Sequence, residues 1–216
     1  MSRWEPNALE RLQRAAMELY RERGFDETTV AEIAARAGLT ERTFFRYFAD
    51  KREVLFAGAG PLHELLRDKV ARAPDSTAPI DAVAAALEAS SAVFEERRDF
   101  ARQRHALIAA HPELQERELI KLASLAATLA EALRRRGVTD PAAILAGEAG
   151  IAVFRLAFES WVHDPKRRDF SRHVRESLGA LKAVTAGKVT RAAAPSTSRA
   201  RGASPAGRAS GRRSSG

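Results

Sequence analysis

Apolar residues recur along most of this chain at intervals of three and four positions, the period that places them on one face of an α-helix. Glycine and proline interrupt this pattern and divide it into segments. The segments with a helical pattern are 6–23, 29–37, 40–48, 51–73, 81–97, 99–110, 112–136, 141–163 and 169–186. Because the helical period recurs in each segment, we predict an all-α fold.

The first segment has a start signal and a stop signal. Pro6 suits the opening turn of a helix, and Gly24 follows its last periodic residue. The stripe that should be buried consists of Ala8, Leu12, Ala15 and Leu19.

Residues 29–50 predict two short capped helices joined by a glycine turn. Thr29 and Glu32 form a capping box, in which the hydroxyl and the carboxylate each satisfy an amide of the first turn. Gly38 occupies the reversal, where a left-handed backbone favours glycine, and Thr40 caps the second helix. This arrangement is typical of a helix-turn-helix, a motif that reads DNA.

The second helix of this motif has a buried side and an exposed side. Phe44 and Phe48 lie one turn apart and should face the core, so that Arg42, Thr43 and Arg46 face solvent. A recognition helix brings such residues to base edges in the major groove, where arginine bonds guanine O6 and N7 bidentately. We therefore predict that Arg42 and Arg46 read bases.

The threonines of the motif suit phosphate oxygens. Hydroxyls and backbone amides at helix N-termini favour anions, which assigns Thr29, Thr40 and Thr43 to positioning on the DNA backbone. The alternative is that the threonines are ordinary helix caps, that the phenylalanines are all core, and that the arginines form a solvated face.

A further capping box is predicted just after the motif. Asp50 and Glu53 have the spacing for it, so a helix should begin there. Lys51 in its first turn should direct its ammonium toward the same phosphate backbone as Tyr47.

Residues 8–56, and most clearly the run GLTERTFFRYFADKREVL at 38–55, resemble the N-terminal DNA-binding domain of TetR-family transcriptional regulators. The resemblance implies three helices in this domain and a double-stranded DNA operator as its partner. The family pattern commonly has tyrosine where this chain has Phe45, and histidine where it has Tyr47. Phe45 therefore suits a thymine methyl or a sugar rather than a phosphate.

The same resemblance implies a C-terminal domain that binds a small effector between its middle helices and dimerises through its last two, here 141–163 and 169–186. A palindromic operator requires two recognition helices about one DNA turn apart, so we predict a homodimer. Small residues let a partner helix approach closely, although the same residues also suit an interior core. The residues concerned are Ala142, Leu145, Ala146, Ala149, Ala152, Val153 and Leu156.

Nine residues suit an effector pocket that is mostly apolar with a few polar groups. They are Phe94, Arg102, His105, Ile108, Leu122, Leu125, Phe154, Phe158 and Trp161. All nine also suit a plain core, and we favour core for the aromatic residues, because their helical spacing needs no ligand to explain it. Arg102, Arg104 and His105 suit either a solvated helix face or the anionic end of an effector. The segment at 96–122 resembles the ligand domain of regulators with acyl-CoA-like effectors, and this resemblance implies an effector of that kind.

The formal net charge of +8 does not belong to the predicted fold. Residues 1–176 carry 28 basic and 28 acidic side chains, so the whole excess lies beyond them. We predict a DNA-binding domain at 1–52, an effector-binding and dimerisation domain at 53–186, and a disordered basic tail at 187–216. The tail is either a solvated extension or a sequence-independent tether to DNA.

Gly58, Gly60 and Pro61 interrupt the helical pattern of 51–73, which predicts a break or kink near Gly60. The interruption is either a local irregularity or a hinge through which the effector domain moves the DNA-binding domain.

Enzymatic classes find no support in the chain. It has no cysteine, and its five histidines never form a Glu-x-x-His pair or a His-Glu-x-x-His helix. The run at 58–61 lacks the third glycine of a dinucleotide-binding loop, and neither a P-loop nor a serine elbow is present. We predict no catalytic activity, no cofactor and no metal.

The apolar runs are too short and too often charged for a membrane span, so a cytoplasmic protein is expected. The prediction is a ligand-responsive repressor that binds a palindromic operator. The alternative is an architectural DNA-binding protein that coats DNA through its basic tail.

Overall fold

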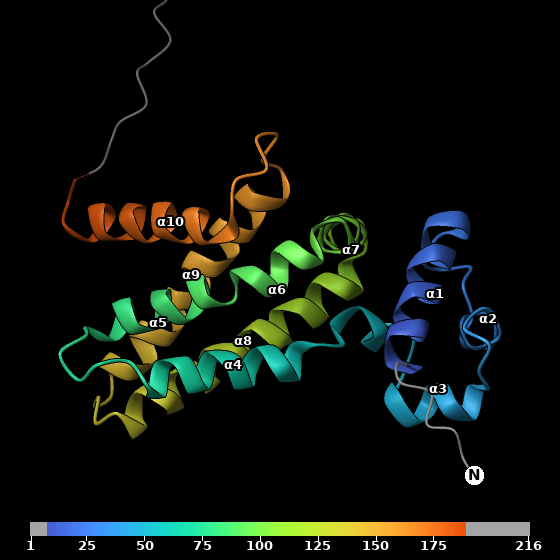
Figure 1. Cartoon of the computed structure of the whole chain (residues 1–216), viewed down its shortest axis with the longest axis horizontal. Helices are drawn as coiled ribbons and strands as arrows, with labels where there is room; N and C mark the ends of the chain where they lie inside the picture. The colour runs from blue at the N-terminus through green and yellow to red at the C-terminus, as the bar shows by residue number, and fades with distance from the viewer. Residues whose placement is uncertain (1–7, 189–216) are drawn as a thin grey trace, which may run out of the picture.

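The computed structural model describes residues 8–188, and within this range every regular element is a helix (Figure 1). The predicted all-α fold is confirmed. Helices α1 to α3 form a small N-terminal group at the right of Figure 1, and α4 to α10 form a larger group to its left. Pro6 and residues 189–216, to which the sequence assigns a helix start and most of the basic tail, lie outside the described residues.

The N-terminal elements are α1 (Ala8–Arg23), α2 (Val30–Arg36), α3 (Glu41–Tyr47) and the 3-10 helix η1 (Glu53–Phe56). The C-terminal elements are α4 (Ala59–Ala71), α5 (Pro79–Ala89), α6 (Ser91–Glu96), α7 (Arg98–Ala110), α8 (Pro112–Arg135), α9 (Ala142–Val162) and α10 (Phe170–Thr185). All predicted segments except 51–73 and 81–97 match an observed helix to within two residues.

The predicted helix at 51–73 is interrupted earlier than expected. The short helix η1 is followed by Gly58, whose φ of 105° lies in the left-handed region that favours glycine. Helix α4 begins directly after it, so that Gly60 and Pro61 fall in the first turn of α4 rather than at a kink. Proline is accommodated there because the amides of a first turn have no helical partner.

The predicted helix at 81–97 is two helices, α5 and α6, which meet at Ser90. The Ser90 hydroxyl is buried and donates to the carbonyl of Leu87 at 2.6 Å. A serine that bonds its own helix backbone in this way competes with the regular ladder, and neither glycine nor proline marks the break.

Helix α9 begins without a side-chain cap. The carboxylate of Asp140, just before it, accepts from the Arg134 guanidinium at 3.2 Å. Pro141, which follows a cis peptide bond, takes the cap position itself.

The N-terminal core is built from α1, α2 and α3, as the pattern predicts. Leu12, Leu19, Ile33 and Phe44 are buried in it. All of the apolar residues of η1 also belong to this core, namely Val54, Leu55 and Phe56. The N-terminal core therefore extends beyond residue 52 as far as η1, and Gly58 separates it from α4.

The C-terminal core lies where α5, α8, α9 and α10 meet. Gly147 and Gly150 of α9 allow this close packing. A Cβ at Gly147 would lie 2.7 Å from the carbonyl oxygen of Ala126, and one at Gly150 would lie 2.4 Å from a methyl carbon of Val83. The two glycines thus set α9 directly against α8 and α5.

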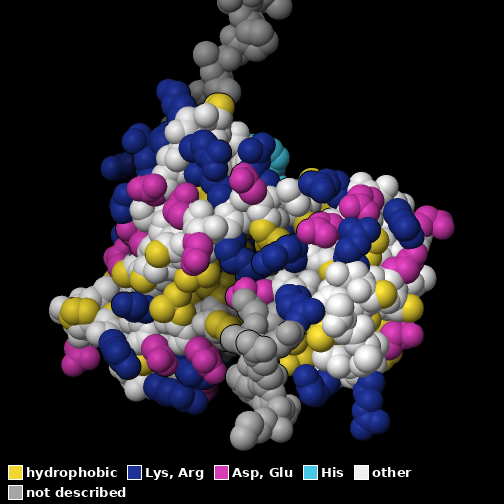
Figure 2. Space-filling model, turned by 45° about the vertical axis from the view of Figure 1, so that its right-hand side comes forward, with side chains coloured by type: hydrophobic (Ala, Val, Ile, Leu, Met, Phe, Trp, Pro, Cys, Tyr) yellow, Lys and Arg dark blue, Asp and Glu magenta, His cyan; other side chains and the backbone are white. Residues whose placement is uncertain are grey.

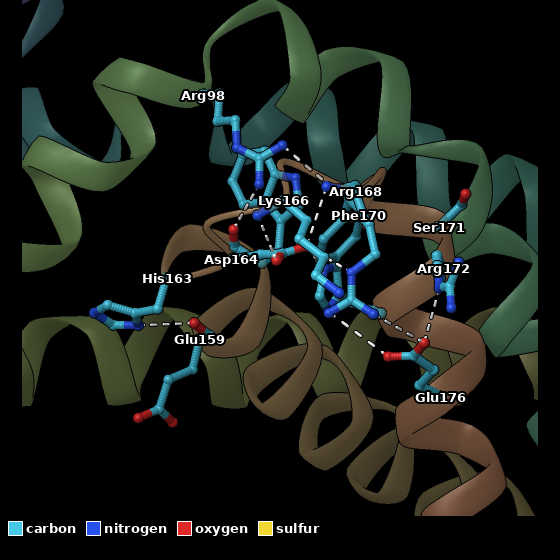
Figure 3. Close-up of polar contacts among 12 residues, drawn as sticks. Arg98, Glu159, His163, Asp164, Lys166, Arg168, Phe170, Ser171, Arg172 and Glu176 are labelled. Carbon is cyan, nitrogen blue, oxygen red and sulfur yellow. Dashed lines mark hydrogen bonds and ion pairs between the residues drawn. The ribbon is translucent and has the colours of Figure 1, made fainter.

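A network of polar contacts fixes the turn between α9 and α10 (Figure 3). The buried Asp164 carboxylate accepts from Arg168 Nε at 2.8 Å and from the amide of Lys166 at 3.0 Å. The hydrogen bond from Arg168 is the main cause that holds the pKa of Asp164 well below its usual range. The ring of His173 in α10 lies 3.2 Å from the same carboxylate, which joins α10 to the turn.

Across residues 8–188, no helix combines the length and the apolar character that a membrane crossing requires. In the same range, no cluster of His, Asp and Glu side chains is arranged to hold a metal ion.

Candidate DNA interface and effector cleft

The predicted caps of the helix-turn-helix are present. The Thr29 amide and hydroxyl each donate to the Glu32 carboxylate at 2.9 Å, and the Glu32 amide donates back to the hydroxyl at 3.3 Å. The hydrogen bonds from Thr29 hold the pKa of Glu32 below its usual range. Thr40 accepts from the amide of Thr43 at 3.2 Å, and so begins α3. Both helices therefore start where the sequence predicts.

A side chain from α1, which the sequence does not single out, holds the turn between α2 and α3. Arg11 donates to the carbonyl of Ala37 at 2.6 Å, directly beside Gly38 with its φ of 65°. Arg36 at the end of α2 pairs with Glu22 of α1 at 2.8 Å. These contacts join residues far apart in sequence, so helical periodicity carries no signal of them.

Helix α3 presents the predicted face to solvent. Phe44 and Phe48 are buried beneath it, while Arg42 and Arg46 are exposed and Thr43 is half-buried.

Two aromatic side chains lie on the same exposed surface. Phe45 is 55% exposed and Tyr47 is 40% exposed, which is unusual for large apolar rings in a folded domain. The Arg46 guanidinium lies 5.0 Å from the centre of the Tyr47 ring and donates to its hydroxyl at 3.2 Å. Arginine and aromatic side chains are thus available together on one short helix.

Lys51 has a different environment from the predicted one. Its ammonium donates to the carbonyls of Phe25, Asp26 and Thr28 at 2.8 to 3.0 Å, and it lies 4.6 Å from the centre of the Phe25 ring. An ammonium has three hydrogens, and all of them are used here. In this structure Lys51 therefore holds the loop before α2, and its contact with a phosphate stays a prediction.

Lys51→Met is expected to lower the free energy of unfolding by about 2 kcal/mol, because three carbonyls lose a charged donor. Operator binding should weaken with the stability of the loop, but the dependence of log Kd on log salt should stay as in the wild type. A lost phosphate contact would instead reduce this slope by about 0.9 per site. Titrations at several salt concentrations separate the two, and Arg52→Met, which removes a neighbouring exposed cation, is the matched control.

The predicted capping box after the motif is only half formed. Asp50 accepts from the amides of Arg52 and Glu53 at 2.8 and 3.2 Å. The Glu53 carboxylate does not return to Asp50; it pairs with Arg117 and, at 3.0 Å, with Lys121, both in α8. Glu53 thus links η1 to the C-terminal domain.

The nine residues predicted for the effector pocket do not form one site. Phe94, Phe154, Phe158 and Trp161 pack against one another and against Phe170, with ring centres 4.7 to 6.0 Å apart. Leu125 is buried in the same core, so all five residues pack as the core alternative expects. Arg102 is exposed and does not line the cleft described next.

The remaining three, His105, Ile108 and Leu122, line a cleft of about 240 Å³ where α7, α8 and α9 meet. The other lining residues are Ala109, Gln115, Glu118, Leu119 and Arg155. Four of the eight lining residues are apolar, and the polar groups are His105, Gln115, Arg155 and the acidic Glu118. This composition suits a small molecule with an apolar body and a polar end. Glu118, Leu119 and Arg155 carry no distinctive sequence signal and come together only through packing.

A second cleft, of about 480 Å³, lies between α1 and the pair α6 and α7. Its walls carry Glu10, Glu18, Arg14, Arg21 and Arg97. Arg97 crosses this cleft and donates to the Gln13 amide oxygen at 3.1 Å. Eight of its ten lining residues are polar or charged, against four of eight in the first cleft, so it has less of the character of an apolar ligand site.

Comparisons with known proteins agree with this architecture. The sequence profile of bacterial regulatory proteins of the tetR family matches residues 12–57, and the profile of the MftR C-terminal domain matches residues 77–186. The mycofactocin biosynthesis transcriptional regulator MftR of Mycobacterium tuberculosis is 30% identical over 170 residues, which cover 76% of this chain and 82% of that protein.

Solved structures show the same fold. FadR of Thermus thermophilus, a TetR-family transcriptional repressor in complex with lauroyl-CoA, is 27% identical with a TM-score of 0.51, covering 87% of this chain and 98% of that one. A transcriptional regulator from Pseudomonas aeruginosa PAO1 has a TM-score of 0.60 at 21% identity, covering 86% and 94% of the two chains.

A capped helix-turn-helix domain joined to a helical domain with a cleft of apolar and polar groups is the architecture of a one-component DNA-binding regulator. The chain belongs to the TetR family of bacterial regulatory proteins. It is a DNA-binding transcriptional regulator, and its C-terminal half matches the domain found in MftR.

Proposed function

We propose that the protein is a homodimeric repressor that binds a palindromic operator through α3 and leaves it when a small effector occupies the cleft between α7, α8 and α9. The observation that carries the DNA-reading part is the exposed face of α3. Arg42, Phe45 and Arg46 project from a helix whose opposite side is anchored by the buried Phe44 and Phe48. Arginine can bond guanine bidentately, and Phe45 can contact a thymine methyl.

The phosphate contacts are proposed at the helix starts. Thr29 and Thr40 stand at the N-termini of α2 and α3, where free amides favour an anion. The Thr43 hydroxyl lies 3.0 Å from that of Thr40, so both are placed for the same backbone oxygen. Tyr47 offers a further hydroxyl from the exposed end of α3.

The dimer is proposed to form through the outer faces of α9 and α10. Leu145, Ala149, Ala152 and Leu156 follow one another at helical spacing along α9, and the two leucines are 64% and 49% exposed. An apolar stripe on an otherwise charged surface favours burial against a second copy. Val184 of α10, 62% exposed, extends the apolar surface to the neighbouring helix. Figure 2 shows a further patch of hydrophobic side chains, with both basic and acidic side chains around it.

The effector is proposed to carry an acyl chain and an anionic end, as in an acyl-CoA. Leu119, Leu122 and Ile108 offer apolar contacts for the chain, and Arg155 and His105 offer donors for the polar end. The FadR complex with lauroyl-CoA, a similar chain at 27% identity, supports this class. Such a ligand acts only if it binds the free dimer more tightly than the operator-bound dimer.

The first experiment is selection of bound fragments from a random DNA pool, at moderate salt, with the full chain and with a version ending at Ala186. A shared palindrome from both versions supports the proposal and makes the tail auxiliary. Unselective binding that is lost with the tail would favour an architectural protein, because coating DNA needs charge and no sequence preference.

In the same selection, Arg42→Ala or Arg46→Ala should relax the preference at one base pair of each half-site and cost about 1 to 3 kcal/mol of operator affinity. Both arginines are exposed, so stability should be unchanged. Arg102→Ala removes an exposed arginine from α7 and is the matched control. If both α3 variants retain the full wild-type preference, these two residues do not read bases.

A further inference from the structure

Arg104 of α7 links the C-terminal domain to the DNA-binding domain. Its Nε donates to the carbonyl of Leu55 at 2.7 Å, and its guanidinium lies 4.9 Å from the centre of the Phe56 ring. Leu55 and Phe56 belong to η1 and are buried in the N-terminal core. Arg104 thus binds the segment through which the chain leaves the DNA-binding domain.

Glu118 of α8 holds the other side of the same guanidinium. Its carboxylate accepts from Arg104 Nη1 at 3.0 Å. Burial of Arg104 lowers its pKa, and the charge of Glu118 acts in the opposite direction and compensates it. A buried guanidinium that loses its carboxylate is costly, so Arg104 depends on the position of Glu118.

Glu118 also lines the effector cleft, together with Leu119 and Leu122 of the same helix. One side chain therefore belongs to both the cleft wall and the ion pair that holds η1. The second link to η1, from Glu53 to Arg117 and Lys121, uses no residue that lines the cleft. An occupant of the cleft contacts the first link and leaves the second untouched.

We propose that Glu118 and Arg104 are positioning residues that couple occupancy of the cleft to the DNA-binding domain through η1. This inference rests on the proposed function, because it takes the cleft as the effector site. An occupant whose polar end shifts the Glu118 carboxylate deprives Arg104 of its counter-charge. Arg104 then holds the Leu55 carbonyl less firmly, and η1 and the helix-turn-helix are released from one fixed orientation.

A ligand-independent test uses the cleft itself. Leu122→Trp places an indole in the cleft and serves as a permanent occupant. Amide hydrogen exchange of residues 53–57 should become about tenfold faster in Leu122→Trp and in Glu118→Gln, with no further increase in the double variant. Two contacts on one route give such non-additive effects. Glu116→Gln, at an exposed neighbouring position of α8, is the matched control and should exchange as the wild type does.

A second test uses lauroyl-CoA as the probe and the selected palindrome as the DNA. In the wild type the probe should weaken operator binding by about tenfold, a usual size for coupling between sites. Arg104→Met should bind the probe as the wild type does but show less than a threefold effect of the probe on operator binding. If Arg104 is merely structural, Arg104→Met should lower the stability of the protein, and lauroyl-CoA should still weaken operator binding tenfold.

The outcomes separate the two proposals. A wild type that binds no lauroyl-CoA overturns the effector class, while the exchange test of the coupling stands by itself. The coupling is overturned if Leu122→Trp and Glu118→Gln leave the amide exchange rates of residues 53–57 unchanged, or if their effects on these rates are additive in the double variant. It is also overturned if lauroyl-CoA weakens operator binding by Arg104→Met as much as tenfold.

Discussion

Replacing Leu145 and Leu156 together by glutamate is expected to separate the dimer and to weaken operator binding by roughly a thousandfold or more, the usual gap between specific and non-specific affinity. In the proposed dimer the two-fold axis places each substitution twice in the interface, so four carboxylates would have to be buried without partners. A monomer carries a single recognition helix and cannot span two half-sites. Sedimentation and operator titration at the same protein concentration measure both effects.

Val93→Glu is the matched control for this pair, because Val93 of α6 is 49% exposed but lies outside the α9 stripe. It should remain a dimer with the affinity of the wild type. A fully dimeric Leu145→Glu, Leu156→Glu protein with unchanged operator affinity would place the dimer interface on another face.

Trp161→Ala is expected to lower the free energy of unfolding by about 3 to 5 kcal/mol, and the Tm by roughly 10 °C. The side chain is fully buried, and its Nε1 donates to the Glu95 carboxylate at 2.7 Å. Arg98 lies over its ring at 4.8 Å and also donates to the Trp161 carbonyl at 2.8 Å. The substitution therefore leaves a cavity and disturbs a polar network at once. Thermal and denaturant unfolding measure the loss.

Trp161→Phe keeps one aromatic ring but loses the indole donor and part of the buried ring volume, so a loss of about 2 kcal/mol is expected, from one hydrogen bond and a small cavity. Glu95 would retain its bond from the amide of Phe170 at 2.8 Å. Because Trp161 is core rather than cleft wall, this variant should bind lauroyl-CoA as the wild type does. Loss of probe binding in a variant of near-normal stability would show that Trp161 contacts the ligand.

The DNA-binding motif was predictable because its signals are local. The Thr29 and Glu32 pair, the turn at Gly38 and the cap at Thr40 each act within four residues, and the structure has all of them. The contacts that position the motif are not local. Arg11 reaches 26 residues along the chain to Ala37, and no periodicity records such a choice of partner.

The carbonyl contacts of Lys51 were not predictable for the same reason. Its place after the motif suits a phosphate contact, yet three carbonyls 23 to 26 residues earlier surround its ammonium. A flexible cation binds the nearest unsatisfied acceptors, and their positions depend on the tertiary fold. The break at Ser90 had no signal either, since serine is tolerated within helices and only its bond to Leu87 marks the change.

The effector cleft was predictable only in part. An aromatic residue at helical spacing gives the same pattern whether it packs on a neighbour or on a ligand, and Phe94, Phe154 and Phe158 pack on neighbours. Which polar residues face the cleft depends on how α7, α8 and α9 cross. The packing of these helices places Arg155 and Glu118 in the cleft, and no sequence motif marks either residue.

The N-terminal core is completed by residues from the other domain. Ile108 of α7 and Leu114 of α8 are buried within it, and the Phe25 ring lies against His111 at 5.1 Å between centres. A hybrid regulator made by joining this helix-turn-helix to a foreign effector domain at Gly58 would lack these contacts. Apolar residues of the N-terminal core would then be exposed to solvent. A functional transfer of the DNA-binding domain therefore has to include residues 108–114, which complete its core. The two domains of this protein can be exchanged between regulators only if the contacting surfaces of both domains are kept together.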